Sequence, residues 1–158
     1  VGPSRVAKTR RGRRVLRARE PRIIEPPKRV LVMRGHATSA ITCAVLADLA
    51  LLFKPHVQRL SRKNPGVLPF EPGGDARLEA FAAKSDASMV VLANHTKKRP
   101  NNLVLVRLFD GRILDLVELG VLKFQRMVDF SPVKWPPEGV KPCIVFEGDL
   151  FDNDERLR

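Results

Sequence analysis

Long hydrophobic runs are absent from this sequence, and so are the motifs of the common enzyme classes. The 158 residues contain no stretch of about 18 apolar residues, so we expect no membrane-spanning segment. The amino terminus is rich in arginine, which argues against a secretory signal peptide. There is no Gly-rich phosphate loop, no nucleophile elbow, and no His-x-x-x-His or Cys-x-x-Cys spacing. These absences favour a soluble intracellular protein with no cofactor, no metal and no catalytic role.

Cysteine and histidine are scarce. Cys43 and Cys143, the two cysteines, lie 100 residues apart and form no metal-type pair. A disulfide between them is one alternative, and the expected state inside a cell is two reduced thiols in the core. His36 and His95 each follow an expected strand, and we expect both to be loop residues near the surface.

Positive charge is plentiful and unevenly distributed. The net charge is +12, and residues 1–29 hold 11 Lys or Arg against 2 acids, whereas the other 129 residues hold 18 against 15. Charge concentrated in an arm indicates a polyanionic partner. The same charge can also act as a nuclear or nucleolar targeting signal, and the two roles are compatible. The length suits one domain, and 44% hydrophobic residues can build a core.

The arm itself contains seven basic residues between positions 8 and 19 and no acid. Self-repulsion is expected to keep it disordered alone, with helix forming once phosphates or an acidic partner screen the charge. Pro26 and Pro27 then mark a linker. The candidate RNA-binding residues of the arm are Lys8, Arg10, Arg11, Arg13, Arg14, Arg17 and Arg19.

Apolar runs separated by turn residues predict a mixed α/β layer. Residues 30–33 are apolar throughout, as in a buried strand. Thr38 or Ser39 can cap a helix that runs to about Phe53, and its lack of charge other than Asp48 places it inside the protein. Further expected elements are a possible short strand at 57–60 within a loop at 54–74, a helix from Asp75 to Lys84 capped by Asp75, buried strands at 88–93 and 103–109, and a last strand at 143–146.

One segment has two readings. Asp110-Gly111 between apolar runs is a good hairpin signal, so residues 112–121 can be a returning strand. The apolar residues of the same segment also fit helical spacing.

A compact cationic loop precedes the strand at 103–109. Lys97, Lys98 and Arg99 can neutralise phosphates, while Asn101 and Asn102 can donate and accept at a base or ribose edge. The proline between them stiffens the loop, so less entropy is lost on binding. The loop therefore predicts an RNA contact, and a solvated turn that doubles as a nuclear localisation signal is the alternative.

A second phosphate site is possible at the start of the helix after the first strand. Arg34, Thr38 and Ser39 lie there, and free backbone amides with the helix dipole favour an anion. An ordinary capped turn explains the same residues.

An enzymatic alternative rests on three acids. Asp110, Asp115 and Glu118 can act as metal ligands of a ribonuclease beside the loop. However, the turn explains Asp110, and Arg107 and Arg112 can pair with the acids. We therefore expect no enzyme.

An ordered set of motifs resembles the Brix-domain family. It comprises Arg19-Glu20-Pro21 followed by Ile24-Glu25, residues 31–35 leading to Thr38-Ser39, residues 95–120 including Arg-Pro-Asn-Asn-Leu and Phe-Asp-Gly-Arg-Ile-Leu-Asp, and residues 141–148. The resemblance extends over roughly residues 8–151. It implies an α/β fold of two similar halves, like the anticodon-binding domain of certain tRNA synthetases.

The resemblance also implies a function. Members of the subgroup that this chain most resembles pair with the regulator of ribosome synthesis protein. They help install 5S rRNA, with its ribosomal proteins, on the nascent large subunit in the nucleolus. The residues at 97–99, 101 and 102 match a motif associated with rRNA contact, and residues 8–19 match a basic extension. A nuclear protein-interaction module without RNA specificity is the main competing function.

The resemblance gives a domain organisation as well. Residues 1–28 are the arm and linker, 29–151 the amino-terminal part of a Brix domain, and 152–158 an acidic, charged tail. The chain begins at Val1 and nothing in it matches the family's second half, so we expect a piece of a longer protein. We also expect it to expose an apolar sheet that the missing half or the partner covers.

Overall fold

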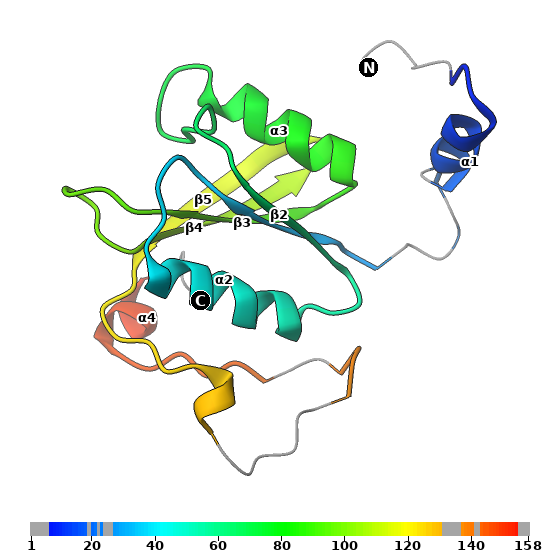
Figure 1. Ribbon diagram of the computed structural model, residues 1–158. Helices are drawn as coiled ribbons and strands as arrows, with labels where there is room; N and C mark the ends of the chain where they lie inside the picture. The colour runs from blue at the N-terminus through cyan, green and yellow to red at the C-terminus, as the bar shows by residue number, and fades with distance from the viewer. Residues whose placement is uncertain are drawn as a thin grey trace.

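The computed structural model describes residues 7–18, 20–21, 23, 27–130, 137–140 and 143–154. Its elements, in chain order, are α1 (Arg10–Ala18), β1 (Val30–Arg34), α2 (Ala40–Leu52), β2 (Val57–Lys63), α3 (Gly74–Ser85), β3 (Met89–Asn94), β4 (Asn102–Phe109), β5 (Arg112–Gly120), the 3-10 turn η1 (Met127–Asp129) and α4 (Asp149–Asn153). The strands form one sheet in the order β2-β1-β3-β4-β5 (Figure 1). β1 is parallel to β2 and β3, whereas β4 is antiparallel to β3 and β5. The expected α/β class with a mixed sheet is confirmed.

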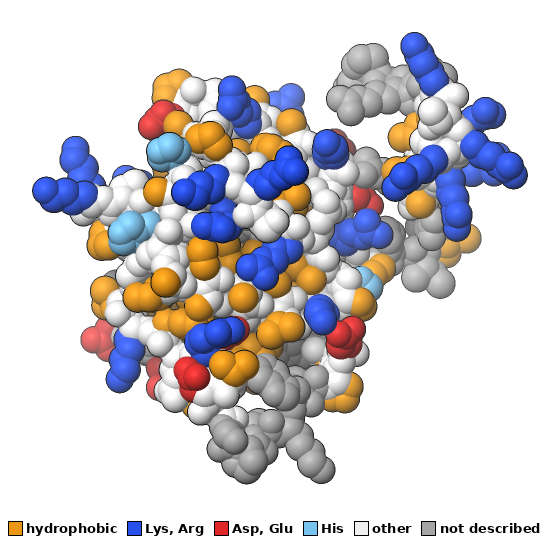
Figure 2. All heavy atoms as spheres, in the orientation of Figure 1, with side chains coloured by type: hydrophobic (Ala, Val, Ile, Leu, Met, Phe, Trp, Pro, Cys, Tyr) orange, Lys and Arg blue, Asp and Glu red, His pale blue; other side chains and the backbone are white. Residues whose placement is uncertain are grey.

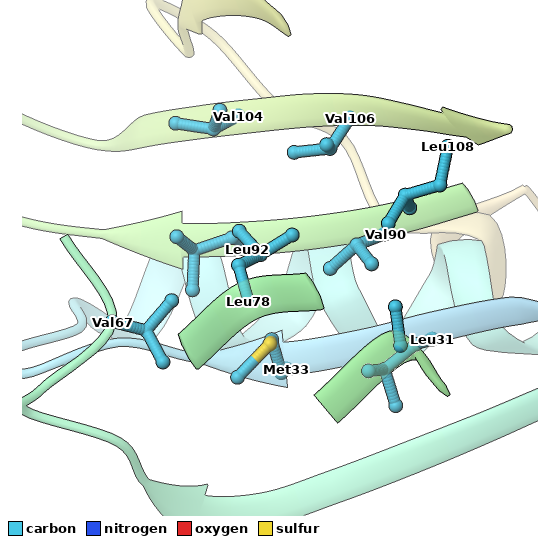
Figure 3. Packing of buried hydrophobic residues seen from close by; sticks show 10 residues of the cluster. Leu31, Met33, Val67, Leu78, Val90, Leu92, Val104, Val106 and Leu108 are labelled. Atoms are coloured by element: carbon cyan, nitrogen blue, oxygen red, sulfur yellow. The ribbon is translucent and has the colours of Figure 1, made fainter. Parts of the chain in front are cut away.

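β1 and β3 are apolar up to their last residues, Arg34 and Asn94, because a helix covers each face of the sheet (Figure 1). In β1, Val30 and Val32 pack on the side of α2, while Leu31 and Met33 pack on the side of α3. Figure 3 shows the α3 side, where Leu78 of the helix lies among side chains of β1, β3 and β4. Burial on both faces therefore explains why the strand at 30–33 was predictable from local sequence.

Helix α2 is apolar around its whole circumference because it is covered on two sides. The sheet lies on one side, and Val121 and Phe124, in the segment after β5, pack against the same cluster. The only charged residue of the helix, Asp48, is 3% exposed, and its Oδ2 accepts a hydrogen bond from the Met127 N–H at 2.8 Å. A guanidinium nitrogen of Arg126 lies 3.6 Å from Oδ1. The buried acid thus holds the segment after β5 against α2.

Helix caps and strand lengths differ in part from expectation. Ser39, one of the two expected caps, accepts the Thr42 N–H at 3.1 Å. Asp75 does not cap α3, because Gly73, at φ 79°, stands at the cap and Asp75 lies in the first turn. β2 runs to Lys63 rather than residue 60, because β1 supplies a parallel partner over that length.

Strand pairing decides the structure of two further segments, residues 112–120 and 143–146. Residues 112–120 form a strand rather than a helix, because they pair with β4 through the Asp110-Gly111 turn. The expected strand at 143–146 is wrong. Those residues are irregular, and Ile144, Val145 and Phe146 are exposed. Both cysteines are free, but Cys143 is exposed rather than in the core.

The basic arm contains a helix. Thr9 accepts the Gly12 N–H at 3.0 Å at the start of α1, and no residue of α1 is buried. Figure 1 shows the helix apart from the sheet. The structure therefore has the helical state that was expected only after the charge is screened. The linker residues at 24–26 lie outside the described part.

Most of the exposed large apolar side chains lie outside the sheet, because α2 and α3 cover its two faces. Phe109 and Leu114 are its exposed large apolar residues, at 75% and 63%. A larger group follows the sheet and consists of Leu122, Val128, Phe130, Val140, Ile144, Val145 and Phe146. We expected an exposed apolar sheet. The structure instead exposes apolar side chains mainly in the residues that follow the sheet. Within the described ranges, no helix has the length and apolarity needed to cross a membrane.

Candidate nucleic-acid interface

The cationic loop between β3 and β4 is a tight, internally bonded turn. The Thr96 N–H donates to the carbonyl oxygen of Arg99 at 3.1 Å, and the Arg99 N–H donates back to Thr96 Oγ1 at 3.0 Å. Lys97 and Lys98 stand at the tip of this turn and are exposed. Figure 2 shows Lys and Arg side chains projecting where Figure 1 draws this loop. The backbone that carries the two lysines is thus held in a defined turn, and their side chains are exposed to solvent.

Arg99 is less free than its two neighbours. Its Nη1 lies 2.9 Å from Glu118 Oε1 on β5, and its Cζ lies 5.4 Å from the centre of the Phe70 ring. The second distance is within the range of a cation–π contact. Arg99 therefore ties the loop to β5 and to the segment before α3, which limits its use as a mobile phosphate ligand.

The two asparagines of the loop face the protein. Asn101 has φ 47°, a left-handed conformation that asparagine tolerates better than most residues. Its Oδ1 accepts from Ser39 Oγ at 2.7 Å, and its N–H donates to His95 Nδ1 at 3.1 Å. Its carbonyl oxygen accepts the Val121 N–H at 3.0 Å. Asn101 therefore joins the loop to the cap of α2 and to the end of β5.

Asn102 is 6% exposed and begins β4. Its Nδ2 donates to Glu118 Oε1 at 2.6 Å, the same oxygen that Arg99 contacts. The Asn101 amide and the Asn102 Nδ2 thus make hydrogen bonds within the protein, and RNA contact by the two residues stays a prediction. His36 is exposed and His95 half-buried, both in loops as expected.

The loop lies at the end of the sheet where parallel α/β proteins bind ligands. β1 is followed by β2 on one side, whereas β3 lies on its other side, so the strand order reverses between β1 and β3. Ligands in such sheets bind outside the carboxyl ends of the strands at that point. Here a hollow of about 440 Å³ lies at those ends, between the loop and the segment before α3.

The expected phosphate site at the start of α2 is occupied by internal contacts. Arg34 donates to Thr38 Oγ1 from Nε at 3.0 Å and from Nη2 at 2.6 Å. Ser39 caps the helix and donates to Asn101. These contacts are those of a capped turn, and phosphate binding by the three residues stays a prediction.

The arginines of the helix in the arm lie at the surface. Every arginine of α1 is exposed, namely Arg10, Arg11, Arg13, Arg14 and Arg17. Figure 2 shows Lys and Arg side chains projecting where Figure 1 draws α1. Lys8 is exposed just before the helix. Arg19 lies outside the described residues.

A further cationic strip was missed by the sequence analysis. Arg59, Arg62 and Lys63 are exposed on β2, the edge strand of the sheet. Arg34 pairs in register with Lys63 at the same end as the cationic loop. The signal was present in the pattern Val-Gln-Arg-Leu-Ser-Arg-Lys, whose polar positions suit the open edge of a sheet, where charge discourages pairing with other chains.

Two of the three acids of the nuclease alternative, Asp115 and Glu118, bind cations or amides. Arg107 Nε lies 2.9 Å from Asp115 Oδ1, and hydrogen bonds from Arg107 lower the pKa of Asp115 below its usual value. Glu118 accepts from Arg99 and Asn102. No group of three or more His, Cys, Asp or Glu that could hold a metal is present among the described residues. Pairing of Arg107 with an acid, suggested by the sequence, is confirmed.

The chain thus folds into an α/β domain with a mixed sheet. A cationic loop and a hollow lie together at the carboxyl ends of β1 and β3. A model of the Brix domain matches residues 35–158. The chain therefore belongs to the Brix-domain family, and the resemblance seen in its motifs is confirmed.

Curated relatives extend the match to the arm. A ribosome production factor 2 homolog of Arabidopsis thaliana is 42% identical over 98% of this chain and 50% of its own length. The homolog of Schizosaccharomyces pombe is 43% identical over 92% of this chain and 44% of its own length. The human homolog is 40% identical over 96% and 48%. The chain thus spans about half the length of the curated relatives it matches.

One solved structure gives a weaker likeness. The probable ribosomal biogenesis protein from Aeropyrum pernix K1 is 17% identical, with a TM-score of 0.40 over 58% of this chain and 47% of its own. That likeness is too low to establish a shared fold.

Proposed function

We propose that this chain is part of a non-catalytic ribosome assembly factor that binds rRNA and a partner protein. It would help recruit 5S rRNA, with its ribosomal proteins, to the pre-60S large subunit. The observation that carries the proposal is identity of about 40% over nearly the whole chain to ribosome production factor 2 homologs. The work would take place in the nucleus, within the nucleolus.

Two cationic regions support rRNA binding. Lys97 and Lys98 stand free at the tip of a braced loop, and α1 exposes five arginines. Phosphate contacts dominate the affinity of proteins for nucleic acids, so both regions would contribute mainly through charge. Specificity for one RNA requires charges at fixed positions. Of these two regions, the loop is the one that joins two strands of the sheet.

Exposed apolar residues support a protein partner. The segment from Leu122 to Phe146 presents several large apolar side chains to solvent. Surfaces of this kind mark protein interaction sites. The partners we propose are the regulator of ribosome synthesis protein, the ribosomal proteins that bind 5S rRNA, and the second half of the Brix domain.

The test compares binding of 5S rRNA with that of a length-matched control RNA over a range of salt concentrations. The remainder of the protein and the partner are supplied in each titration. Lys97→Ala with Lys98→Ala removes the two free loop charges and spares Arg99, which braces the loop. Lys28→Ala with Arg112→Ala is the matched control, because both residues are exposed and lie at the opposite end of the sheet.

We expect the loop variant to lose preference for 5S rRNA and to lower the salt slope by about 2, since each phosphate contact contributes about 1. The control variant should keep the preference. Equal, purely salt-driven binding of both RNAs by the unmodified protein would contradict RNA recognition by the loop. Specificity would then come from the partner proteins.

A further inference from the structure

The hollow at the carboxyl ends of β1 and β3 has a volume of about 440 Å³, within the range of small-molecule sites. It is open to solvent and lies directly below the cationic loop, since Thr96 and Arg99 line it. Its other wall comes from residues 65–71, before α3. The hollow therefore sits where a polyanion held by the loop would first meet the domain.

The wall formed by residues 65–71 is largely apolar. Leu68 and Phe70 line it, with exposed fractions of 37% and 50%. Arg99 lies over the Phe70 ring at 5.4 Å from its centre, which fixes the ring beside the loop. A half-exposed aromatic ring next to a guanidinium is a suitable stacking surface for a planar ring, because bases stack on both groups.

The opposite wall carries polar groups with unused hydrogen-bonding capacity. The side-chain amide of Asn94, at the end of β3, is half-buried and has no hydrogen bond to any other described residue. Thr96 Oγ1 accepts one hydrogen bond from Arg99, so its own proton is available to a ligand. Asn102 donates to Glu118 through Nδ2, and its Oδ1 has no partner within the described part of the chain. These groups offer both donors and acceptors.

The position of the Asn94 amide is built into the fold. A Cβ added to Gly35 would lie 1.7 Å from Asn94 Oδ1, so only glycine at position 35 leaves room for the amide where it stands. Gly35 is itself held by a hydrogen bond from its N–H to the carbonyl oxygen of Ala93 at 2.9 Å. The amide is thus placed against the hollow by two neighbouring strand ends.

Cations flank the mouth of the hollow on two sides. Lys97 and Lys98 project from the loop next to Thr96. On the other side Lys63 ends β2, two residues before Pro65, which lines the hollow. A nucleotide whose base enters the hollow would have its flanking phosphates between these two groups.

We propose that the hollow binds the base of a single unpaired nucleotide of RNA. The base stacks on Phe70, its edge meets Asn94, Thr96 and Asn102, and its flanking phosphates contact the cations at the mouth. The proposal rests on the proposed RNA-binding function and adds the kind of RNA feature recognised, namely a bulged or looped-out nucleotide rather than a continuous duplex.

The test uses two fluorescein-labelled RNA hairpins that differ only by a one-uridine bulge. Phe70→Ala removes the stacking surface, and Phe109→Ala is the matched control, since Phe109 is 75% exposed at the other end of β4. We expect Phe70→Ala to weaken binding of the bulged hairpin roughly 5- to 150-fold and to leave the paired hairpin unchanged. Phe109→Ala should change neither.

Two further measurements keep the test decisive. Phe70→Leu retains apolar bulk without an aromatic face, so it reports on stacking if Phe70→Ala fails to fold. A 4-thiouridine at the bulge should cross-link to peptides that contain residues 65–71 or 94–96 and not to those that contain residues 109–112.

The outcomes separate this inference from the proposed function. Equal binding of both hairpins that is weakened by Lys97→Ala with Lys98→Ala would overturn the nucleotide pocket and leave RNA binding in place. No salt-dependent binding of either hairpin would overturn both. Unchanged preference for the bulge in Phe70→Ala, together with lost affinity for the partner protein, would mean that a protein segment fills the hollow and would also overturn the inference.

Discussion

Helix α1 and the loop at residues 95–101 are both positively charged, but they differ in how firmly the rest of the protein holds them. α1 exposes five arginines and has no buried residue, so burial against the sheet domain does not fix the positions of these charges. The loop has only three cations, but Asn101 bonds it to the cap of α2 and to Val121 after β5. Charge alone attracts a polyanion, whereas charge at a fixed place can also select among RNA shapes. We therefore propose that α1 would supply most of the affinity for RNA and the loop most of the discrimination between RNAs.

Removing the charge of α1 should have the largest effect on binding. Changing its five arginines to glutamine keeps good helix formers, and we expect the salt slope to fall by about 3 to 4, since each phosphate contact contributes about 0.7 on the single-strand scale. At about 0.1 M salt this corresponds to a loss of affinity of about 10³-fold on the single-strand scale. The measurement is a salt titration with 5S rRNA and a control RNA. The ratio of the two affinities should not change, and a changed ratio would contradict the division of roles.

Leucine truncation separates the two regions by stability. Leu31→Ala removes a side chain with no exposure from the core between the sheet and α3, and should lower the free energy of unfolding by about 2–5 kcal/mol. Leu16→Ala is the matched change in α1, where the side chain is 38% exposed, and should have almost no effect. Urea denaturation measures both. A similar loss from Leu16→Ala would show that α1 packs against the domain.

Asn101 tests whether the loop depends on its anchor. Asn101→Ala removes the hydrogen bond from Ser39 and places a side chain without a polar group at φ 47°, so we expect a loss of about 1–3 kcal/mol in the free energy of unfolding. Asn101→Gly removes the same hydrogen bond but tolerates that φ, and should cost about 1 kcal/mol less. Equal losses in urea denaturation would mean that backbone strain plays no part.

Both Asn101 variants should also weaken the preference of the loop for 5S rRNA, while a change in α1 leaves it. This smallest expected effect is the most direct check of the comparison between the two regions. Unchanged preference in Asn101→Ala would show that the anchor is not needed to place Lys97 and Lys98.

Local sequence was a good guide wherever burial is the same on every side of an element. β1 and α2 were predictable because the strand is covered on both faces and the helix on two sides, so most of their residues are apolar. The same reasoning failed at Cys143–Phe146, which are apolar but lie exposed and unpaired within the described residues. An apolar run shows what could be buried, but not whether a partner strand is present.

The cationic loop, the arm and the family were determined by the sequence itself, because charge and motif order do not depend on distant contacts. Tertiary structure decided the rest. Pairing with β4 made residues 112–120 a strand, and a glycine at the end of β1 left room for the Asn94 amide of β3. Contacts with Ser39 and Glu118 turned Asn101 and Asn102 inward, 62 and 16 residues from those partners along the chain. Hydrogen-bond partners so far apart are brought together only by the strand order of the sheet, which local composition does not encode.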